Sequence, residues 1–222
     1  MKLRWLVWLI FGTGIGLRTA AAWDFQGHMM VACVAFDRLD SATRAKVDRL
    51  LRLHPDYPKW TAGIQDDEQR MRVAMMRAAT WPDEIKQDRN YTNDGENPTN
   101  PDAGRNTGYD DHLQHRYWHY IDLPLTAGGA QGQDPPEINA QERLLLFLKT
   151  MAIDPGSDPQ LASRRSYDLV WVLHLIGDIH QPLHCASRFT PEIPKGDQGG
   201  LKVSITPVNG GEPEGLHFYW DG

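Results

Sequence analysis

Apolar residues recur along most of the chain at the three- and four-residue spacing of an α-helix. This spacing predicts helices over residues 27–39, 66–79, 139–153 and 164–180. A further helix is expected over residues 42–53, with Ser41 as its N-cap. The Leu and Met side chains along these segments belong to a hydrophobic core, because their spacing places them on one face of each helix.

Two segments depart from the helical pattern. Residues 86–117 are rich in Asn, Asp, Gly and Pro, which predicts a long surface loop. Residues 199–210 alternate enough between apolar and polar side chains to form one short strand or hairpin. The expected fold class is therefore all-α, a single compact multi-helix domain with a short β-hairpin.

The N-terminus has the order of a secretory signal peptide. Basic residues precede an apolar run over residues 5–17, and three alanines ending at Ala22 provide a small-residue cleavage site. The run is shorter than a comfortable membrane span. We expect a signal peptide over residues 1–22, a domain over residues 23–222, and a secreted protein, extracellular or periplasmic, without a membrane anchor.

Charge limits how the chain could bind nucleic acid. Removing the predicted signal peptide, which carries three basic residues and no acidic ones, changes the formal net charge from −6 to −9. The sequence has no obvious basic stripe for the phosphates of a duplex. Either the protein does not bind nucleic acid, or cations held by the protein contact the phosphates. Cys33 and Cys185 are too few for a disulfide scaffold, and they could form one bridge or remain separate buried thiols.

Histidine and aspartate recur at a spacing suited to metal binding. His174 and Asp178 are four residues apart, so both side chains lie on one helical face, and His217 and Asp221 have the same spacing. One such pair alone is more simply a buried hydrogen bond. Two pairs together with His184 favour ligands of a divalent metal.

Further candidates lie upstream. Asp83 follows a Pro that can start a helix, His119 lies in an aromatic run, and His28 lies near the predicted mature N-terminus. Each has a structural explanation when taken alone. Gly177, between His174 and Asp178, would let another group approach the helix closely.

These residues fall in segments that resemble the trinuclear-zinc nucleases of the S-one/P-one type. That family comprises secreted single-strand nucleases and 3′-nucleotidases and is related to zinc phospholipase C. The matching segments occur in the order of the family and extend over nearly all of the predicted mature chain: Trp23 to His28, Thr80 to Asp83, His119 to Asp122, His174 to His184, and Leu216 to Asp221.

The resemblance implies three zinc ions. One would be held by Asp83, His119, His174 and Asp178, with Asp83 and Asp178 carrying the catalysis. A second would be held by His28, by Asp178 as a bridging ligand, and by the amine and carbonyl oxygen of Trp23. The third would be held by His184, His217 and Asp221. Removal of the signal peptide would free the Trp23 α-amine, whose reference pKa is about 7.7–8.0.

The resemblance also implies a substrate pocket. Tyr120 would stack on a base, Asp122 would bind its edge, and Lys86 would lie near a phosphate where family members often carry Arg. The expected substrates are single-stranded DNA or RNA and 3′-nucleotides, with 5′-phosphorylated products. A monomer without a stable protein partner is expected.

The sequence departs from the family pattern at two places. Leu201 stands where the family has Asn, which predicts altered hydrogen bonding in that loop. The sequence ends at Gly222, whereas family members continue with further helices, so the domain is expected to lack its C-terminal helices.

Two other functions remain as alternatives. A zinc phospholipase C would need a lipid headgroup pocket in place of Tyr120 and Asp122, and a non-catalytic zinc-binding helical module would bind metal without turnover. The aromatic-Ile-Asp run after His119 favours the nuclease. An inactive fragment of a nuclease is the third alternative.

Overall fold

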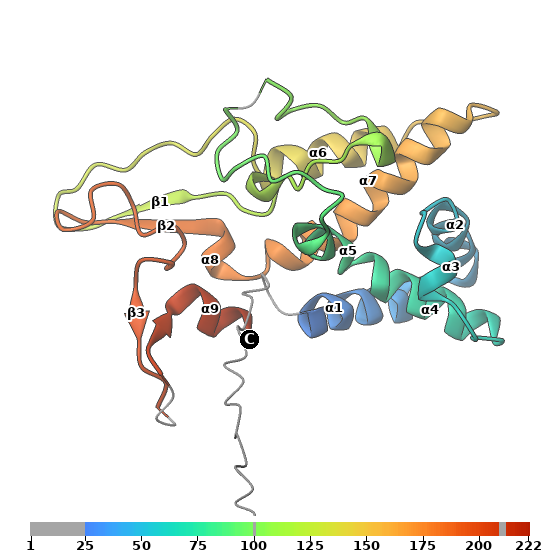
Figure 1. Cartoon of the computed structure of the whole chain (residues 1–222), viewed down its shortest axis with the longest axis horizontal. Helices are drawn as coiled ribbons and strands as arrows, with labels where there is room; N and C mark the ends of the chain where they lie inside the picture. Colours follow the sequence, from blue (N-terminus) through green and yellow to red (C-terminus); the bar gives the residue numbers. More distant parts are fainter. Residues whose placement is uncertain (1–24, 100, 209–211) are drawn as a thin grey trace, which may run out of the picture.

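A computed structural model describes residues 25–99, 101–208 and 212–222, so the predicted signal peptide and Trp23 lie outside it. The predicted helical fold class is confirmed, with only short strands among the described residues (Figure 1). The helices are α1 Phe25–Arg38, α2 Ser41–Leu51, α3 Tyr57–Trp60, α4 Asp67–Ala78, α5 Trp81–Glu84, α6 Ala140–Met151, α7 Pro159–Asp178, α8 Pro182–Cys185 and α9 Leu216–Asp221. The 3₁₀ turns are η1 Ile85–Gln87, η2 Gly108–Asp110 and η3 Arg116–Trp118.

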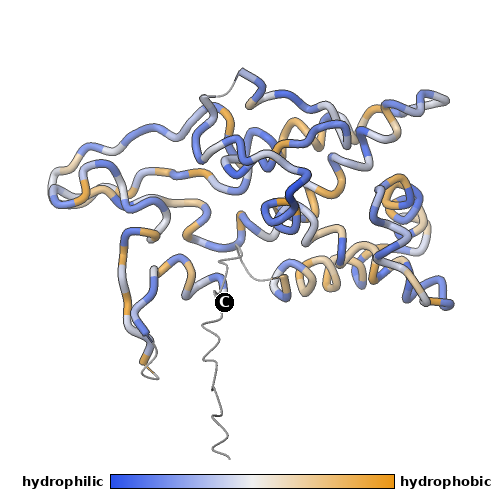
Figure 2. Tube along the Cα trace, viewed as in Figure 1, coloured by the Kyte–Doolittle hydropathy of each residue, from blue (hydrophilic) through white to orange (hydrophobic). Residues whose placement is uncertain are grey.

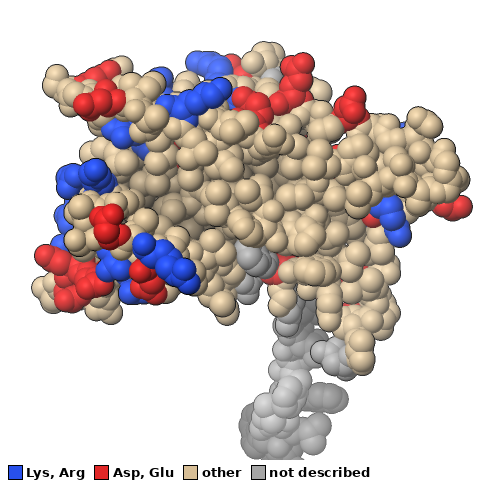
Figure 3. Space-filling model, turned by 180° about the vertical axis from the view of Figure 1, so that it is seen from behind, with Lys and Arg blue, Asp and Glu red and all other residues tan. Residues whose placement is uncertain are grey.

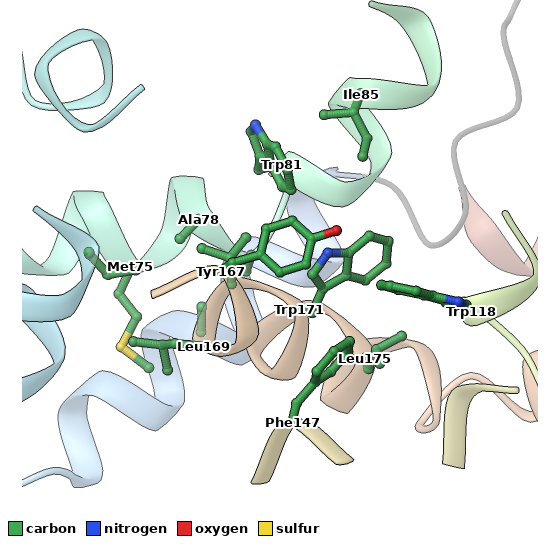
Figure 4. Packing of buried hydrophobic residues seen from close by; sticks show 14 of the residues in the cluster. Met75, Ala78, Trp81, Ile85, Trp118, Phe147, Tyr167, Leu169, Trp171 and Leu175 are labelled. Atoms are coloured by element: carbon green, nitrogen blue, oxygen red, sulfur yellow. The ribbon is translucent and has the colours of Figure 1, made fainter. Parts of the chain in front are cut away.

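Helix α7 forms the centre of the fold. It packs against α1, α2, α4, α5, α6 and η2, and crosses the middle of the view in Figure 1. Its Trp171 is fully buried and lies among Trp118, Phe147 and Tyr167, as Figure 4 shows. Burial of each such aromatic side chain contributes about 1.5–3 kcal/mol or more, so this cluster fixes the helix whose C-terminal turns carry His174 and Asp178.

Side-chain caps set the helix starts. Asp158 accepts hydrogen bonds from the amides of Gln160 and Leu161, so α7 begins at Pro159, earlier than the predicted residue 164. Asp40 rather than Ser41 caps α2, because its Oδ1 accepts from the Thr43 amide at 2.7 Å. A carboxylate one residue earlier in the sequence therefore displaces the predicted cap.

A short parallel pair joins distant segments. β1 (Leu123–Thr126) pairs with β2 (Ala186–Phe189), and Leu123 lies opposite Ala186. The sequence did not predict this pair, since each strand is short and the two are far apart along the chain. The pairing brings the residues after His119 beside the end of α8.

The predicted hairpin is also different in detail. β3 (Ser204–Ile205) pairs antiparallel with β4 (Glu214–Gly215), so the second strand lies beyond the predicted segment 199–210. β4 leads directly into α9, so the hairpin positions the helix that carries His217 and Asp221.

The segment predicted as a surface loop, residues 86–117, is partly internal. It is mostly hydrophilic along its course (Figure 2), yet His115 and Tyr117 are buried. The Nε2 of His115 lies 2.9 Å from Asp111 Oδ2, and the Tyr117 hydroxyl donates to Asp94 Oδ2 at 2.7 Å. Polar composition misled the prediction because these polar groups satisfy one another inside the protein.

The two cysteines are separate thiols. Cys33 Sγ accepts a hydrogen bond from Arg72, and Cys185 Sγ donates to the carbonyl of Ile179.

On the face shown in Figure 3, acidic and basic side chains are interspersed along the edges, which fits the absence of a basic stripe from the sequence. Across the described ranges, no helix is long and apolar enough to cross a membrane.

Candidate metal centre

The C-terminal turns of α7 supply two side chains of the centre. His174 and Asp178 are fully buried, and His174 Nε2 lies 3.1 Å from Asp178 Oδ2. The Nδ1 of His174 donates to the carbonyl of Ala79 at 2.8 Å. Because Nδ1 donates to this carbonyl, Nε2 is the nitrogen that faces Asp178 and could bind a metal.

A second pair of side chains approaches from other elements. Asp83 lies in α5 after Pro82, and His119 follows η3. His119 Nδ1 lies 2.8 Å from His174 Nε2 and 3.8 Å from Asp83 Oδ1. The donor atoms of Asp83, His119 and His174 all lie within 4.8 Å of one another.

His28 approaches Asp178 from α1. Its Nε2 lies 3.4 Å from Asp178 Oδ1, and its ring stacks on His174 with 4.0 Å between centroids. A Cβ atom at position 177 would lie 2.5 Å from His28 Nδ1, so only Gly177 permits this approach. The group approaching this glycine is therefore the histidine that the sequence had singled out, and His28, His174 and Asp178 form a second candidate metal group.

The third group combines α8 and α9. His217 Nε2 lies 3.3 Å from Asp221 Oδ2, and His184 Nε2 lies 3.7 Å from Asp221 Oδ1. Both histidines donate through Nδ1 to backbone carbonyls, His184 to His119 at 3.0 Å and His217 to Gly199 at 2.8 Å. Both rings therefore direct Nε2 at the carboxylate, which is the tautomer for metal binding.

Several of the nitrogen and oxygen atoms that could bind metal in these groups are buried without a hydrogen bond to any described residue. They are Asp83 Oδ2, Asp178 Oδ1, His119 Nε2, His184 Nε2 and Asp221 Oδ2. A buried polar atom left unsatisfied costs about 1–3 kcal/mol, and more when it is charged. Three sets of converging imidazole and carboxylate atoms could each hold a metal ion, and this mixture of nitrogen and oxygen ligands suits zinc better than magnesium.

The predicted substrate residues lie beside these groups. Tyr120, Asp122 and Lys86 line one cavity of about 670 Å³ together with His119, His184, His217 and Asp221. Lys86 Nζ lies 2.7 Å from Asp83 Oδ1, so this ammonium neutralises a candidate ligand as well as facing the cavity. The Tyr120 hydroxyl donates to the carbonyl of Glu96, which holds the ring. Trp23, the remaining predicted ligand, lies outside the described residues.

Comparison with known proteins identifies the family of the chain. The sequence model of a family described as S1/P1 Nuclease matches residues 23–222. The chain belongs to the S1/P1 nuclease family. Endonuclease 4 of Arabidopsis thaliana is 26% identical to it over 213 residues, which is 91% of this chain and 55% of that protein. The chain thus spans about half the length of this relative.

Electrostatics in this S1/P1 family member shift the pKa values of Asp178 and His119 strongly. Burial alone would raise the pKa of Asp178, but His174 and His184 bring it well below its usual range. Burial lowers the pKa of His119 to about 3, with Lys86 adding to the effect. The carboxylate is thus ionised and this imidazole is neutral, the protonation states in which both bind metal.

Sequence reasoning missed the groups that orient these ligands. Gln181 donates to Asp221 across 40 positions of the chain, and the carbonyls of Ala79 and Gly199 hold two histidines. A backbone carbonyl carries no sequence signal. Gln181 lies inside the His174–His184 segment, but its partner could be found only from the fold.

The loop containing Leu201 is held without a polar side chain at that position. Asp197 Oδ1 accepts hydrogen bonds from the amides of Arg188 at 2.9 Å and Gly200 at 3.3 Å. Leu201 itself is 43% exposed and lines the cavity. The side chain at position 201 is therefore part of the wall of the cavity.

Proposed function

We propose that this chain is a zinc-dependent endonuclease that hydrolyses single-stranded DNA or RNA to 5′-phosphorylated products and also has 3′-nucleotidase activity. The observation that carries the proposal is the convergence of three His/carboxylate groups, two of which contribute side chains to one cavity that Tyr120 and Asp122 also line. Membership of the S1/P1 nuclease family and likeness to a protein named an endonuclease support it.

The proposed ligands follow the three groups. Asp83, His119, His174 and Asp178 would hold one ion, and His28, Asp178 and the Trp23 terminus a second. Asp178 suits the shared position, because its Oδ2 lies 3.1 Å from His174 and its Oδ1 3.4 Å from His28. The third ion would be held by His184, His217 and Asp221.

When bound, zinc supplies positive charge for the phosphate and lowers the pKa of a water that attacks phosphorus. The chain's own residues prepare the site for that chemistry. Asp83 and Asp178 stay ionised, and the backbone carbonyls at Ala79, His119 and Gly199 fix the imidazole tautomers. Lys86 adds a positive charge beside Asp83 where a phosphate enters the cavity.

Tyr120 and Asp122 would bind the nucleoside whose 3′-oxygen leaves. Stacking on a tyrosine ring contributes about 1–3 kcal/mol and requires a base freed from its duplex, which favours single strands. Burial, with Asp197 nearby, raises the pKa of Asp122. The oxygens of this carboxyl group can accept hydrogen bonds from a base edge. We further propose that the protein is secreted as a monomer after cleavage following Ala22.

The test compares protein that begins at Trp23 with protein carrying one additional residue before it. Zinc content and hydrolysis of single-stranded DNA, duplex DNA, a 3′-nucleotide and phosphatidylcholine are measured for both. We expect three zinc ions and cleavage of the single strand and the 3′-nucleotide, with both readings reduced by the added residue. Cleavage of phosphatidylcholine alone would assign the chain to the phospholipases, and bound zinc without any hydrolysis would make it a binding module.

A further inference from the structure

The cavity has a second aromatic wall, which is not part of the base pocket proposed for Tyr120 and Asp122. Phe218, in α9, is 40% exposed and lines the same cavity as Tyr120. An aromatic ring of this exposure beside a cluster of ionisable groups forms a flat apolar surface open to a ligand.

A chain of contacts places Phe218 relative to Tyr120. The carbonyl of His119, next to Tyr120, accepts from His184, whose ring stacks on His217 with centroids 4.9 Å apart. The Phe218 ring meets His217 at 6.0 Å and 81°. The rings of His184 and His217 thus connect the segment that carries Tyr120 with Phe218, and all four side chains line the same cavity.

The backbone holds the Phe218 ring in place. A Cβ atom at position 215 would lie 3.2 Å from Cδ2 of Phe218, so the ring packs directly on Gly215. Leu201 and Lys195 line the same cavity, and both are exposed. This wall thus combines a flat ring, an aliphatic side chain and an ammonium group.

We propose that Phe218, Leu201 and Lys195 form a second nucleotide subsite, which binds the nucleotide attached through its 5′-oxygen to the scissile phosphate. Its base stacks on Phe218, and Lys195 neutralises the next phosphate along the strand. This inference rests on the proposed nuclease function and extends it, because it makes a polynucleotide a better substrate than a 3′-mononucleotide.

The same helix supplies matched controls. Tyr219 and Trp220 are 49% and 52% exposed, more than Phe218, but neither lines the cavity. If α9 merely exposed aromatic side chains, the three would behave alike. Lys202, whose ammonium donates to the carbonyl of Gly196, is the corresponding control for Lys195, because it does not line the cavity.

The test compares a dinucleoside monophosphate with a 3′-mononucleotide. F218A is expected to lower kcat/KM for the dinucleotide about ten- to a hundredfold, the range of one lost base stack, while the mononucleotide changes less than about twofold. Phe218→Trp is expected to restore the dinucleotide rate, and Tyr219→Ala to leave both rates unchanged. On a single-stranded oligonucleotide, Lys195→Gln should lower the slope of log KM against log salt by about 0.7, and Lys202→Gln should not.

Equal loss on both substrates in F218A, or no loss on either, would overturn the second subsite and leave the proposed function standing. An equal effect of Tyr219→Ala would do the same. A wild-type protein that hydrolyses neither substrate would overturn the proposed function and this inference with it.

Discussion

The side-chain amide of Gln181 donates to Asp221 Oδ1 at 2.8 Å, while its own oxygen accepts from the amide of Leu183. The second bond fixes which end of the amide faces Asp221, because a backbone N–H can only donate. Gln181 is 1% exposed, so both bonds lie inside the protein. One residue therefore positions a candidate ligand in α9 and caps α8, the helix that carries His184.

Replacing Gln181 with Glu is expected to weaken the third metal group selectively. A carboxylate cannot donate to Asp221 and repels it, and loss of a partner that orients a ligand typically lowers metal affinity about 10- to 100-fold. Zinc content after dialysis against graded chelator should show one ion released at a lower chelator concentration than in the wild type. Gln160→Glu, at an exposed position of α7, controls for the added charge; identical release curves for Q181E and the wild type would disprove this role.

Gly177→Ala is expected to displace His28. Alanine would ordinarily stabilise a helix interior by about 0.5–1 kcal/mol relative to glycine, but its Cβ would lie 2.5 Å from His28 Nδ1. Overpacking of this kind costs about 1–3 kcal/mol, so the sign of the stability change should reverse. Chemical denaturation and zinc stoichiometry measure both effects.

Gly104→Ala is the control for that substitution, because its added methyl would meet only the flexible end of Ile138, at 3.3 Å. A G177A protein that keeps full zinc content and gains stability would show that His28 can move without loss of the site.

Sequence reasoning was most successful where chemistry is local. The four-residue spacing of His174 and Asp178 predicted their shared face, because helical geometry alone determines it. The flanking elements were predicted less well: β1 pairs with β2 from far along the chain, and short strands of this kind carry little periodicity. The carbonyl that holds each histidine comes from a segment distant in the chain, so it depends on the packed fold. The approach of His28 to Asp178 over Gly177 depends on the packing of α1 against α7, which no single segment encodes.

Asp178→Asn is expected to abolish most activity, whereas Asp168→Asn should not. Both are fully buried aspartates of α7, but Asp178 lies among His28, His174 and His184, and Asp168 accepts from Asn106 at 2.6 Å. Removing the shared carboxylate should lower hydrolysis of single-stranded DNA by more than about a hundredfold and reduce zinc content. Asp168→Asn retains the oxygen that Asn106 binds, so zinc and activity should persist. Equal losses in the two variants would indicate general damage to α7.

His54 gives the fold an acid sensitivity that is separate from the metal groups. The ring is 2% exposed and packs against Trp60 with 4.1 Å between ring centroids, and its Nδ1 accepts from the amide of Asp56 at 2.9 Å. Burial lowers its pKa to about 3, against 6.5 for the ordinary side chain. Below pH 6.5 the His54 imidazole therefore binds a proton in the unfolded chain, whereas in the folded chain it binds one only near pH 3.

His54→Asn keeps an acceptor for the Asp56 amide but removes this titration. The unfolding free energy of the wild type should fall by about 1.4 kcal/mol for each pH unit between 6.5 and about 3 on account of His54, in addition to losses from other groups. H54N should be the less stable protein at pH 7.5, because asparagine only partly fills the space among Trp60, Trp81 and Tyr109, and the difference should shrink as the pH is lowered. Denaturant titrations of both proteins at pH 7.5, 6, 5 and 4, in the presence of chelator, measure that difference. A gap that stays constant over this range would mean that His54 takes up its proton in the folded state, and that burial does not hold it neutral.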